Sequence, residues 1–309
     1  MSKMLIGNGI VTTDEVIKQG YDFVGLKMAG MLKVQENTVE QDLTIKGADK
    51  YLPPGTVLPL VFTQDTPDKI WVAAGQAINM EVVVSGGVEP YSYQWKKATV
   101  NVGGNQPSYS IPSAASGNSG TYTVTVTDAE GKSVTSTPCM VSVLAKKADV
   151  NGTIGTAVGT STLFSYPASV GPTDLTLTAN NGATVSAGNT SITPTARGVT
   201  TVTAKLGSSN SVTANITVTP VVTGKGDITG KKAGDVLSVA DLFTLTNGAV
   251  AGDITGVTGT DVTWNNTAKT LTIANPVTTP GADITLAFTV GSGVTKAGTL
   301  VLKAVAAAA

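Results

Sequence analysis

The sequence of 309 residues lacks histidine and contains only one cysteine and one arginine. Without histidine, it can form neither a Ser-His-Asp or Cys-His nucleophile system nor a metal site that uses imidazole. The single cysteine, Cys139, has no partner for an intrachain disulfide, so we expect a small buried apolar side chain. Because Arg197 is the only arginine and the formal net charge is -1, we expect no nucleic-acid partner.

Carboxylates are too dispersed to indicate a catalytic site. No glutamate follows Glu130. The later aspartates lie near expected turns, where turn and cap roles are common: Asp174, Asp227, Asp235, Asp241 and Asp253. No glycine-rich phosphate loop lies between a strand and a helix. We therefore expect no enzymatic activity, no catalytic residue, no cofactor and no metal.

Long apolar runs are also missing. Residues 1–7 do not form the apolar core of a signal peptide, and no stretch has the length of a transmembrane helix. We expect a protein made in the cytoplasm, with no membrane insertion.

The sequence is rich in threonine, valine and alanine and contains 35 glycines and 14 prolines. β-Branched residues between glycine and asparagine turns are typical of strands, and the length fits about two to four domains. We expect a mainly all-β fold, with tandem sandwiches after a small N-terminal α+β domain.

Residues 1–68 differ from the rest because they hold 15 of the 41 charged residues. Residues 12–20 predict a short helix, with Thr12 as the N-cap and Gly20 at the end. Residues 43–46 and 57–62 predict strands, and residues 63–68 predict a linker. We assign residues 1–68 to the N-terminal domain.

Residues 69–146 predict a β-sandwich. Apolar side chains alternate along an expected strand at Ile78, Met80, Val82 and Val84. A second alternation includes Tyr93 and Trp95, which we expect to face the core together. Residues 123–126 and 134–143 predict a final hairpin, turned by residues 128–132.

This region resembles the immunoglobulin superfamily. Trp95 matches the core tryptophan of that family, and Tyr122 in Ser-Gly-Thr-Tyr matches its tyrosine corner. Val82 and Val124 stand at the positions of the paired cysteines. The resemblance implies a sandwich whose core is filled by two valines instead of a disulfide. Residues 86–91 also resemble the entry of polycystic-kidney-disease-type β-modules.

Two further sandwiches are expected. Residues 147–220 resemble the bacterial immunoglobulin-like group found in bacterial surface proteins and bacteriophage virion proteins, through the segments 183–188, 192–198, 200–205 and 212–218. Residues 221–309 predict a C-terminal β-sandwich, with a hairpin at 262–264 and 270–273 and closing strands at 284–290 and 300–305.

The whole arrangement resembles a tailed-bacteriophage decoration protein with immunoglobulin-like domains. This resemblance implies a location on the outer capsid surface and the major capsid protein as partner, with a homo-oligomer on the capsid as one arrangement. Residues 1–68 would anchor the chain, with Met28, Met31 and Leu32 as candidate capsid contacts.

Bacterial surface glycans are a second candidate partner, because repetition over a shell multiplies weak contacts. Tyr91 and Tyr109 are the candidate glycan contacts. A tail or neck protein of a virion and a bacterial surface adhesin are the alternative functions.

Overall fold

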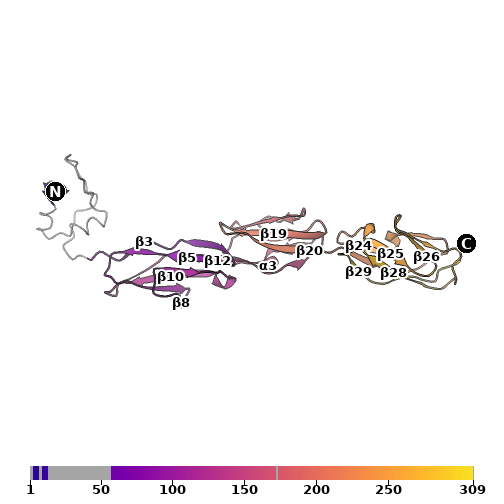
Figure 1. The fold of residues 1–309 in the computed structure, drawn as a ribbon, viewed down its shortest axis with the longest axis horizontal. Helices are drawn as coiled ribbons and strands as arrows, with labels where there is room; N and C mark the ends of the chain where they lie inside the picture. The colour runs from indigo at the N-terminus through magenta and orange to yellow at the C-terminus, as the bar shows by residue number, and fades with distance from the viewer. Residues whose placement is uncertain (1–2, 7–8, 13–56, 172, 309) are drawn as a thin grey trace.

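The computed structural model describes residues 3–6, 9–12, 57–171 and 173–308. Residues 57–308 form β-sandwich modules that follow one another in a row (Figure 1). We call them the first module (57–146), the second module (147–218) and the third module (221–308). Each has its own buried apolar cluster. The expected mainly β fold with tandem sandwiches is confirmed.

The N-terminal part is described only in two short strands, β1 (Lys3–Ile6) and β2 (Gly9–Thr12), which pair antiparallel. The remainder of the helix expected at residues 12–20 and the strand expected at 43–46 lie outside the described residues.

The first module contains one large sheet facing two short ribbons. The sheet runs β8 (Val100–Val102), β7 (Ser92–Lys97), β10 (Gly120–Thr127), β12 (Cys139–Lys146) and β4 (Lys69–Ala73), with β11 (Ser133–Thr135) beside β10. The ribbons are β3 (Val61–Gln64) with β6 (Val83–Ser85), and β5 (Ile78–Glu81) with β9 (Ser108–Ile111). A short 3-10 helix, η1 (Ser116–Asn118), precedes β10.

The core of the first module is closed by aromatic and aliphatic side chains. Trp95 is fully buried, and its indole Nε1 donates to the Gln106 carbonyl at 3.0 Å. The buried Tyr122 hydroxyl donates to the Asn118 carbonyl at 2.8 Å. Val82 and Val124 lie in the same buried cluster. The core tryptophan and the tyrosine corner are therefore confirmed.

The first module begins earlier than the sequence predicted. Strand β3 pairs with β6, and Leu60 is buried in the module core. In the segment expected to be a linker, Thr66 Oγ1 donates to the Thr137 carbonyl at 2.8 Å. Asp65 accepts a hydrogen bond from the Thr137 amide at 2.9 Å. Residues 57–68 thus belong to this sandwich, and the strand expected at 57–62 starts at Val61.

The single strand expected from Ile78 to Val84 is divided. Residues up to Glu81 pair with β9, whereas β6 pairs with β3. Val82 lies between the two strands, and its amide donates to the Pro107 carbonyl at 3.0 Å. The alternation of buried side chains continues across this change of partner, which explains why the sequence showed one continuous pattern.

The second module has two sheets around its own core. One runs β13 (Val150–Asn151), β20 (Val212–Val218), β19 (Gly198–Leu206) and β16 (Leu175–Ala179). The other runs β14 (Val158–Gly159), β18 (Ser191–Thr193) and β17 (Thr184–Val185). A single helical turn, α3 (Thr160–Leu163), leads into β15 (Phe164–Ser165), and this segment places Leu163 and Phe164 in the core.

The third module has three sheets. The first runs β22 (Gly226–Ile228), β30 (Leu300–Leu302), β28 (Ile284–Val290) and β25 (Ile254–Thr258). The second runs β24 (Phe243–Thr246), β21 (Val221–Gly224) and β29 (Thr295–Ala297). The third runs β23 (Val236–Ser238), β27 (Thr270–Ile273) and β26 (Val262–Asn265). The short helices are α4 (Val239–Leu242) and η2 (Ala251–Asp253). The expected hairpin of β26 and β27 is confirmed.

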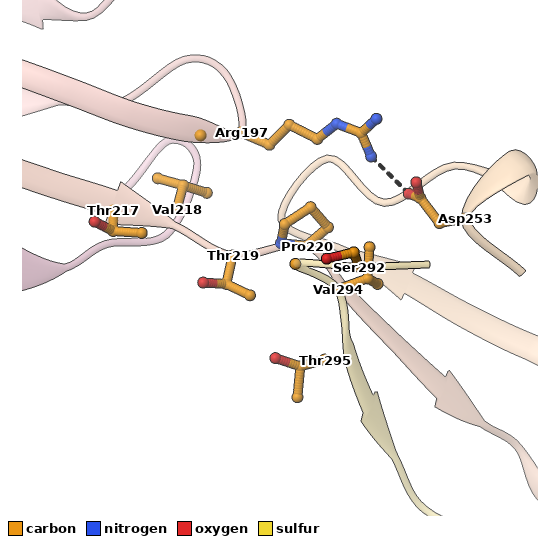
Figure 2. Close-up of a pocket in the computed structure, with 11 residues that line it drawn as sticks. Arg197, Thr217, Val218, Thr219, Pro220, Asp253, Ser292, Val294 and Thr295 are labelled. Atoms are coloured by element: carbon orange, nitrogen blue, oxygen red, sulfur yellow. Dashed lines mark hydrogen bonds and ion pairs between the residues drawn. The ribbon is translucent and has the colours of Figure 1, made fainter. Parts of the chain in front are cut away.

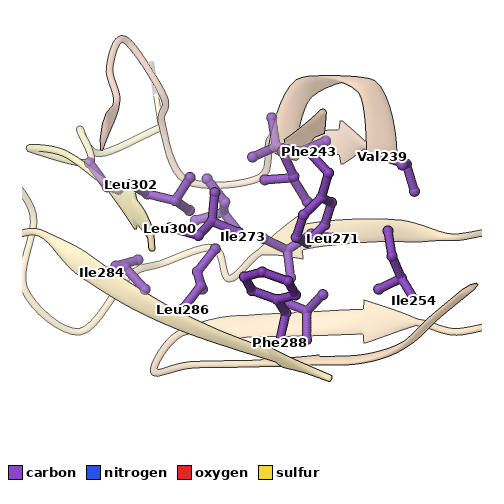
Figure 3. Packing of buried hydrophobic residues seen from close by; sticks show 14 of the residues in the cluster. Val239, Phe243, Ile254, Leu271, Ile273, Ile284, Leu286, Phe288, Leu300 and Leu302 are labelled. Atoms are coloured by element: carbon purple, nitrogen blue, oxygen red, sulfur yellow. The ribbon is translucent and has the colours of Figure 1, made fainter. Parts of the chain in front are cut away.

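The core of the third module lies between these sheets (Figure 3). Phe243 and Phe288 meet edge to face, with ring centroids 4.9 Å apart and an interplanar angle of 65°. Aromatic pairs prefer such geometry, because the positive edge of one ring meets the negative face of the other. Aliphatic side chains of β27, β28 and β30 fill the remaining space.

Cys139 gives a chemical probe of the first module. The side chain is fully buried in the module core. Burial, with a smaller contribution from the charge of Asp68, raises the pKa of the Cys139 thiol to about 11. A thiol reagent attacks the thiolate, so at neutral pH Cys139 should react only when the module opens.

Trp95→Ala should destabilise the first module by roughly 3–5 kcal/mol, because it removes a large buried ring. Since 1.36 kcal/mol corresponds to a factor of ten, the rate of Cys139 labelling should rise on the order of 10²–10⁴-fold. Trp264→Ala is the matched control, because Trp264 packs against the core of the third module. Unchanged Cys139 labelling in Trp95→Ala would show that Trp95 does not hold this core together.

Tyr122→Phe should cost about 1 kcal/mol, because it removes a buried hydroxyl hydrogen bond and leaves the Asn118 carbonyl without it. Cys139 labelling should then accelerate about fivefold. Tyr109→Phe removes a hydroxyl from the neighbouring ring and is the comparison. Equal effects of the two substitutions would contradict a special role for the tyrosine corner.

Candidate contact surfaces and joints

An exposed apolar face lies at the start of the first module. It consists of Val57, Leu58, Val61 and Val83, each between 38% and 45% exposed. Val61 and Val83 come from the paired strands β3 and β6, while Val57 and Leu58 lead into β3. We call these four residues the N-terminal apolar face. Exposed aliphatic side chains on paired strands are candidates for a protein contact surface.

The expected capsid contacts Met28, Met31 and Leu32 lie outside the described residues, so their role stays a prediction. They precede the N-terminal apolar face in the chain. The exposed valines of β3 and β6 were missed in the sequence, because the pairing of these strands was not foreseen.

The expected glycan contacts, Tyr91 and Tyr109, are partly buried against the core of the first module. The Tyr91 hydroxyl donates to the Gly86 carbonyl at 2.7 Å, and burial, followed by the charge of Glu89, raises its pKa. The Tyr109 ring lies 6.0 Å from those of Trp95 and Tyr122. This geometry favours a packing role, and glycan contact through these rings stays a prediction.

The first and second modules share strand β12. This strand pairs with β4 and β10 of the first module and, through Ala145 and Lys146, with β15 of the second. Val143 belongs to the core of the first module, whereas the next residue, Leu144, belongs to the core of the second. The joint therefore has no linker, and one hydrogen-bonded strand fixes both modules.

Trp71 reinforces this joint. It lies on β4 of the first module and packs against the core of the second module. Lys69 Nζ lies 5.7 Å from the centroid of the ring. Gly207, after β19, has a φ of +50°, and a Cβ atom there would overlap the Trp71 ring. Glycine at residue 207 thus permits the close approach of the two modules.

The second and third modules meet at a different kind of joint, around Thr219 and Pro220. A groove of about 590 Å³ lies there, lined mainly by residues 217–220 and 292–295 (Figure 2). Arg197 of the second module reaches across to Asp253 of the third, with Nη1 2.6 Å from Oδ2. The guanidinium of the only arginine in the sequence is therefore engaged in this ion pair.

Asp253 is held in place by its own turn. Its carboxylate accepts a hydrogen bond from the Val250 amide at 2.8 Å. The hydrogen bond from Arg197, and then that from Val250, hold its pKa below the ordinary value. A lowered carboxyl pKa means that the pair stabilises the joint above the ordinary pKa of about 3.9 and is lost as pH falls through the lowered value.

The described residues contain no group of three or more cysteine, aspartate or glutamate side chains that could hold a metal ion. None of the helices in the described part of the chain is long and apolar enough to cross a membrane.

The chain is similar to a decoration protein of Escherichia phage T5, with 34% identity over 101 residues. The expected resemblance is confirmed. The aligned region covers 32% of this chain and 62% of the relative, so the chain spans less than two thirds of the relative's length. No family model matches the chain.

Two solved structures align with much of the chain at low TM-scores. The I-band fragment I67–I69 of titin has 12% identity and a TM-score of 0.34, covering 82% of this chain and 100% of that chain. Sidekick-1 immunoglobulin domains 1–5 have 13% identity and a TM-score of 0.35, covering 79% of this chain and 59% of that chain. The fold assignment rests on the sheets and cores described above.

Gly207→Ala should destabilise the first joint, because the added methyl group must displace Trp71. Gly155→Ala is the matched control: it has a φ of +77° but open space around a Cβ atom. Both changes carry backbone strain, so the overlap should make Gly207→Ala roughly 1–3 kcal/mol more costly. Scanning calorimetry of the full chain tests this difference. Equal shifts in Tm would mean that Trp71 does not press on residue 207.

Proposed function

We propose that this chain is a non-enzymatic structural protein of a tailed bacteriophage that decorates the outer capsid surface. The observation that carries the proposal is the 34% identity, over 101 residues, to the decoration protein of Escherichia phage T5. The partner would be the major capsid protein, bound after synthesis of the chain in the host cytoplasm. A homo-oligomer on the shell is compatible with this role.

The arrangement of the modules supports this proposal. The three sandwiches follow one another in a row (Figure 1), and the residues of the N-terminal apolar face belong to the first strands and entry segment of the first module. We propose that this face and the preceding residues, including Met28, Met31 and Leu32, contact the capsid. Valine and leucine side chains would lose water-exposed area there, which favours binding. The second and third modules would then project away from the shell.

Contact of the sandwich modules with bacterial surface glycans is the second part of the proposal, with Tyr91 and Tyr109 of the first module as the candidate contacts. Many copies on one shell would give avidity even to weak contacts. A glycan array probed with multivalent protein tests it: binding that Tyr91→Ala and Tyr109→Ala weaken would support the two tyrosines, and no binding would remove glycans as partners.

Binding to phage capsids that lack this protein tests the anchoring role. The full chain should bind saturably, and a fragment of residues 57–309 should bind more weakly, because it retains the apolar face without residues 1–56. The fragment starts at residue 57, not at residue 69, because Leu60 and β3 belong to the first sandwich. Binding by neither protein would contradict decoration and favour a tail, neck or cell-surface location.

Val61→Ser with Val83→Ser should reduce capsid affinity of the full chain on the order of tenfold, because two partly exposed apolar side chains no longer become buried. Val236→Ser is the matched control, because Val236 is 61% exposed on β23 of the third module. An equal effect of the control, or no effect of the double variant, would exclude the N-terminal apolar face as a contact.

A further inference from the structure

The two joints of the row differ in construction. At the first, β12 runs through both modules, and Trp71 packs against the second core. At the second, β20 ends at Val218 and β21 begins at Val221, and the two strands belong to different sheets. The clusters assigned to the second and third cores have no residue in common.

Backbone rotation at Thr219 and Pro220, with loss of the side-chain contacts across the joint, would change the angle between the second and third modules. Proline fixes its own φ, so Thr219 and the ψ angle of Pro220 carry most of this freedom. A change in the angle between the first and second modules would instead break the pairing of β12 with β4 or β15. The two joints therefore have different expected stiffness.

We propose that residues 57–308 bend at the joint formed by Thr219 and Pro220, and that the Arg197–Asp253 ion pair latches this joint in the extended arrangement. The pair joins residues 56 positions apart and connects two modules that otherwise form separate sandwiches. Opening the joint would separate its charges, and closing it would restore them. This inference is independent of the capsid role.

Other contacts between the second and third modules lie beside the Arg197–Asp253 pair. Gly248 of the third module faces Ile154 and Arg197 of the second, and a Cβ atom there would lie 3.0 Å and 3.3 Å from them. The Thr295 amide donates to the Pro220 carbonyl at 2.9 Å. Among the described residues, Arg197–Asp253 is the one ion pair between the second and third modules, so the extended arrangement should depend on it.

The latch should be reversible, because Arg197 is partly exposed to water. A partly exposed pair with a charge-assisted hydrogen bond contributes little enough to open thermally. Removing it should raise the ratio of bent to extended molecules on the order of fivefold. The outermost module could then sample a wider cone of directions than the first two modules.

Distances between spin labels in the full chain test the inference. Labels at Thr176→Cys and Thr285→Cys span the second joint, and labels at Thr135→Cys and Thr176→Cys span the first. All three positions are exposed strand residues. Cys139 is buried with a protonated thiol, so native protein should leave it unlabelled.

Arg197→Gln should broaden the distance distribution across the second joint and leave that across the first unchanged. Asp253→Asn should act in the same way, because an asparagine oxygen can still accept from the Val250 amide but the charge is gone. Lys303→Gln is the matched control, because it removes a surface ion pair with Asp283 within the third module.

An unchanged distribution across the second joint in both variants would overturn the latch. Equal broadening across both joints, or equal broadening in Lys303→Gln, would overturn the assignment of bending to Thr219 and Pro220. Should Arg197→Gln prove unstable, Asp253→Asn and a salt titration of the wild-type chain provide the same test. As the salt concentration rises, the distance distribution across the second joint should broaden at a lower concentration than the distribution across the first joint.

Discussion

Strand β12 is the constraint on which the arrangement of the first two modules depends. Successive side chains of a strand point to opposite faces, so Val143 can enter one core while Leu144 enters the next. The same backbone is hydrogen-bonded to strands of both modules. The orientation of the first module relative to the second is therefore set by the backbone hydrogen bonds of β12, and the Trp71 ring against Gly207 fills the adjoining space.

A second constraint is that each sandwich must close its core without a disulfide. In the first module, Val82, Val124 and the fully buried Trp95 occupy the centre, and Tyr122 ties the turn at Asn118 to β10. Asp128 performs a similar task in the β10–β11 turn, where its carboxylate accepts hydrogen bonds from backbone amides, including that of Lys132. Local hydrogen bonds thus hold the turns of the first module in place without a disulfide.

The sequence predicted local features well, because the alternation of apolar side chains and the motifs around Trp95 and Tyr122 each lie within a short segment of the chain. It did not predict the partner of β3, because pairing with β6 joins segments about 20 residues apart with no common motif. The Arg197–Asp253 pair was missed for the same reason. Tyr91 and Tyr109 show a further limit: alternation left their orientation open, and only the folded core shows that both rings are partly buried.

Together these features describe a row of sandwiches with a stiff inner joint, a latched outer joint and an apolar face at its start. The proposed decoration role requires the first, second and third modules to follow one another outward from the surface of a phage shell. Cryo-electron microscopy of capsids saturated with the full chain measures it directly. The account predicts density for the first module nearest the shell, then the second, with the third outermost and more blurred. Density that places the third module against the shell would contradict the account.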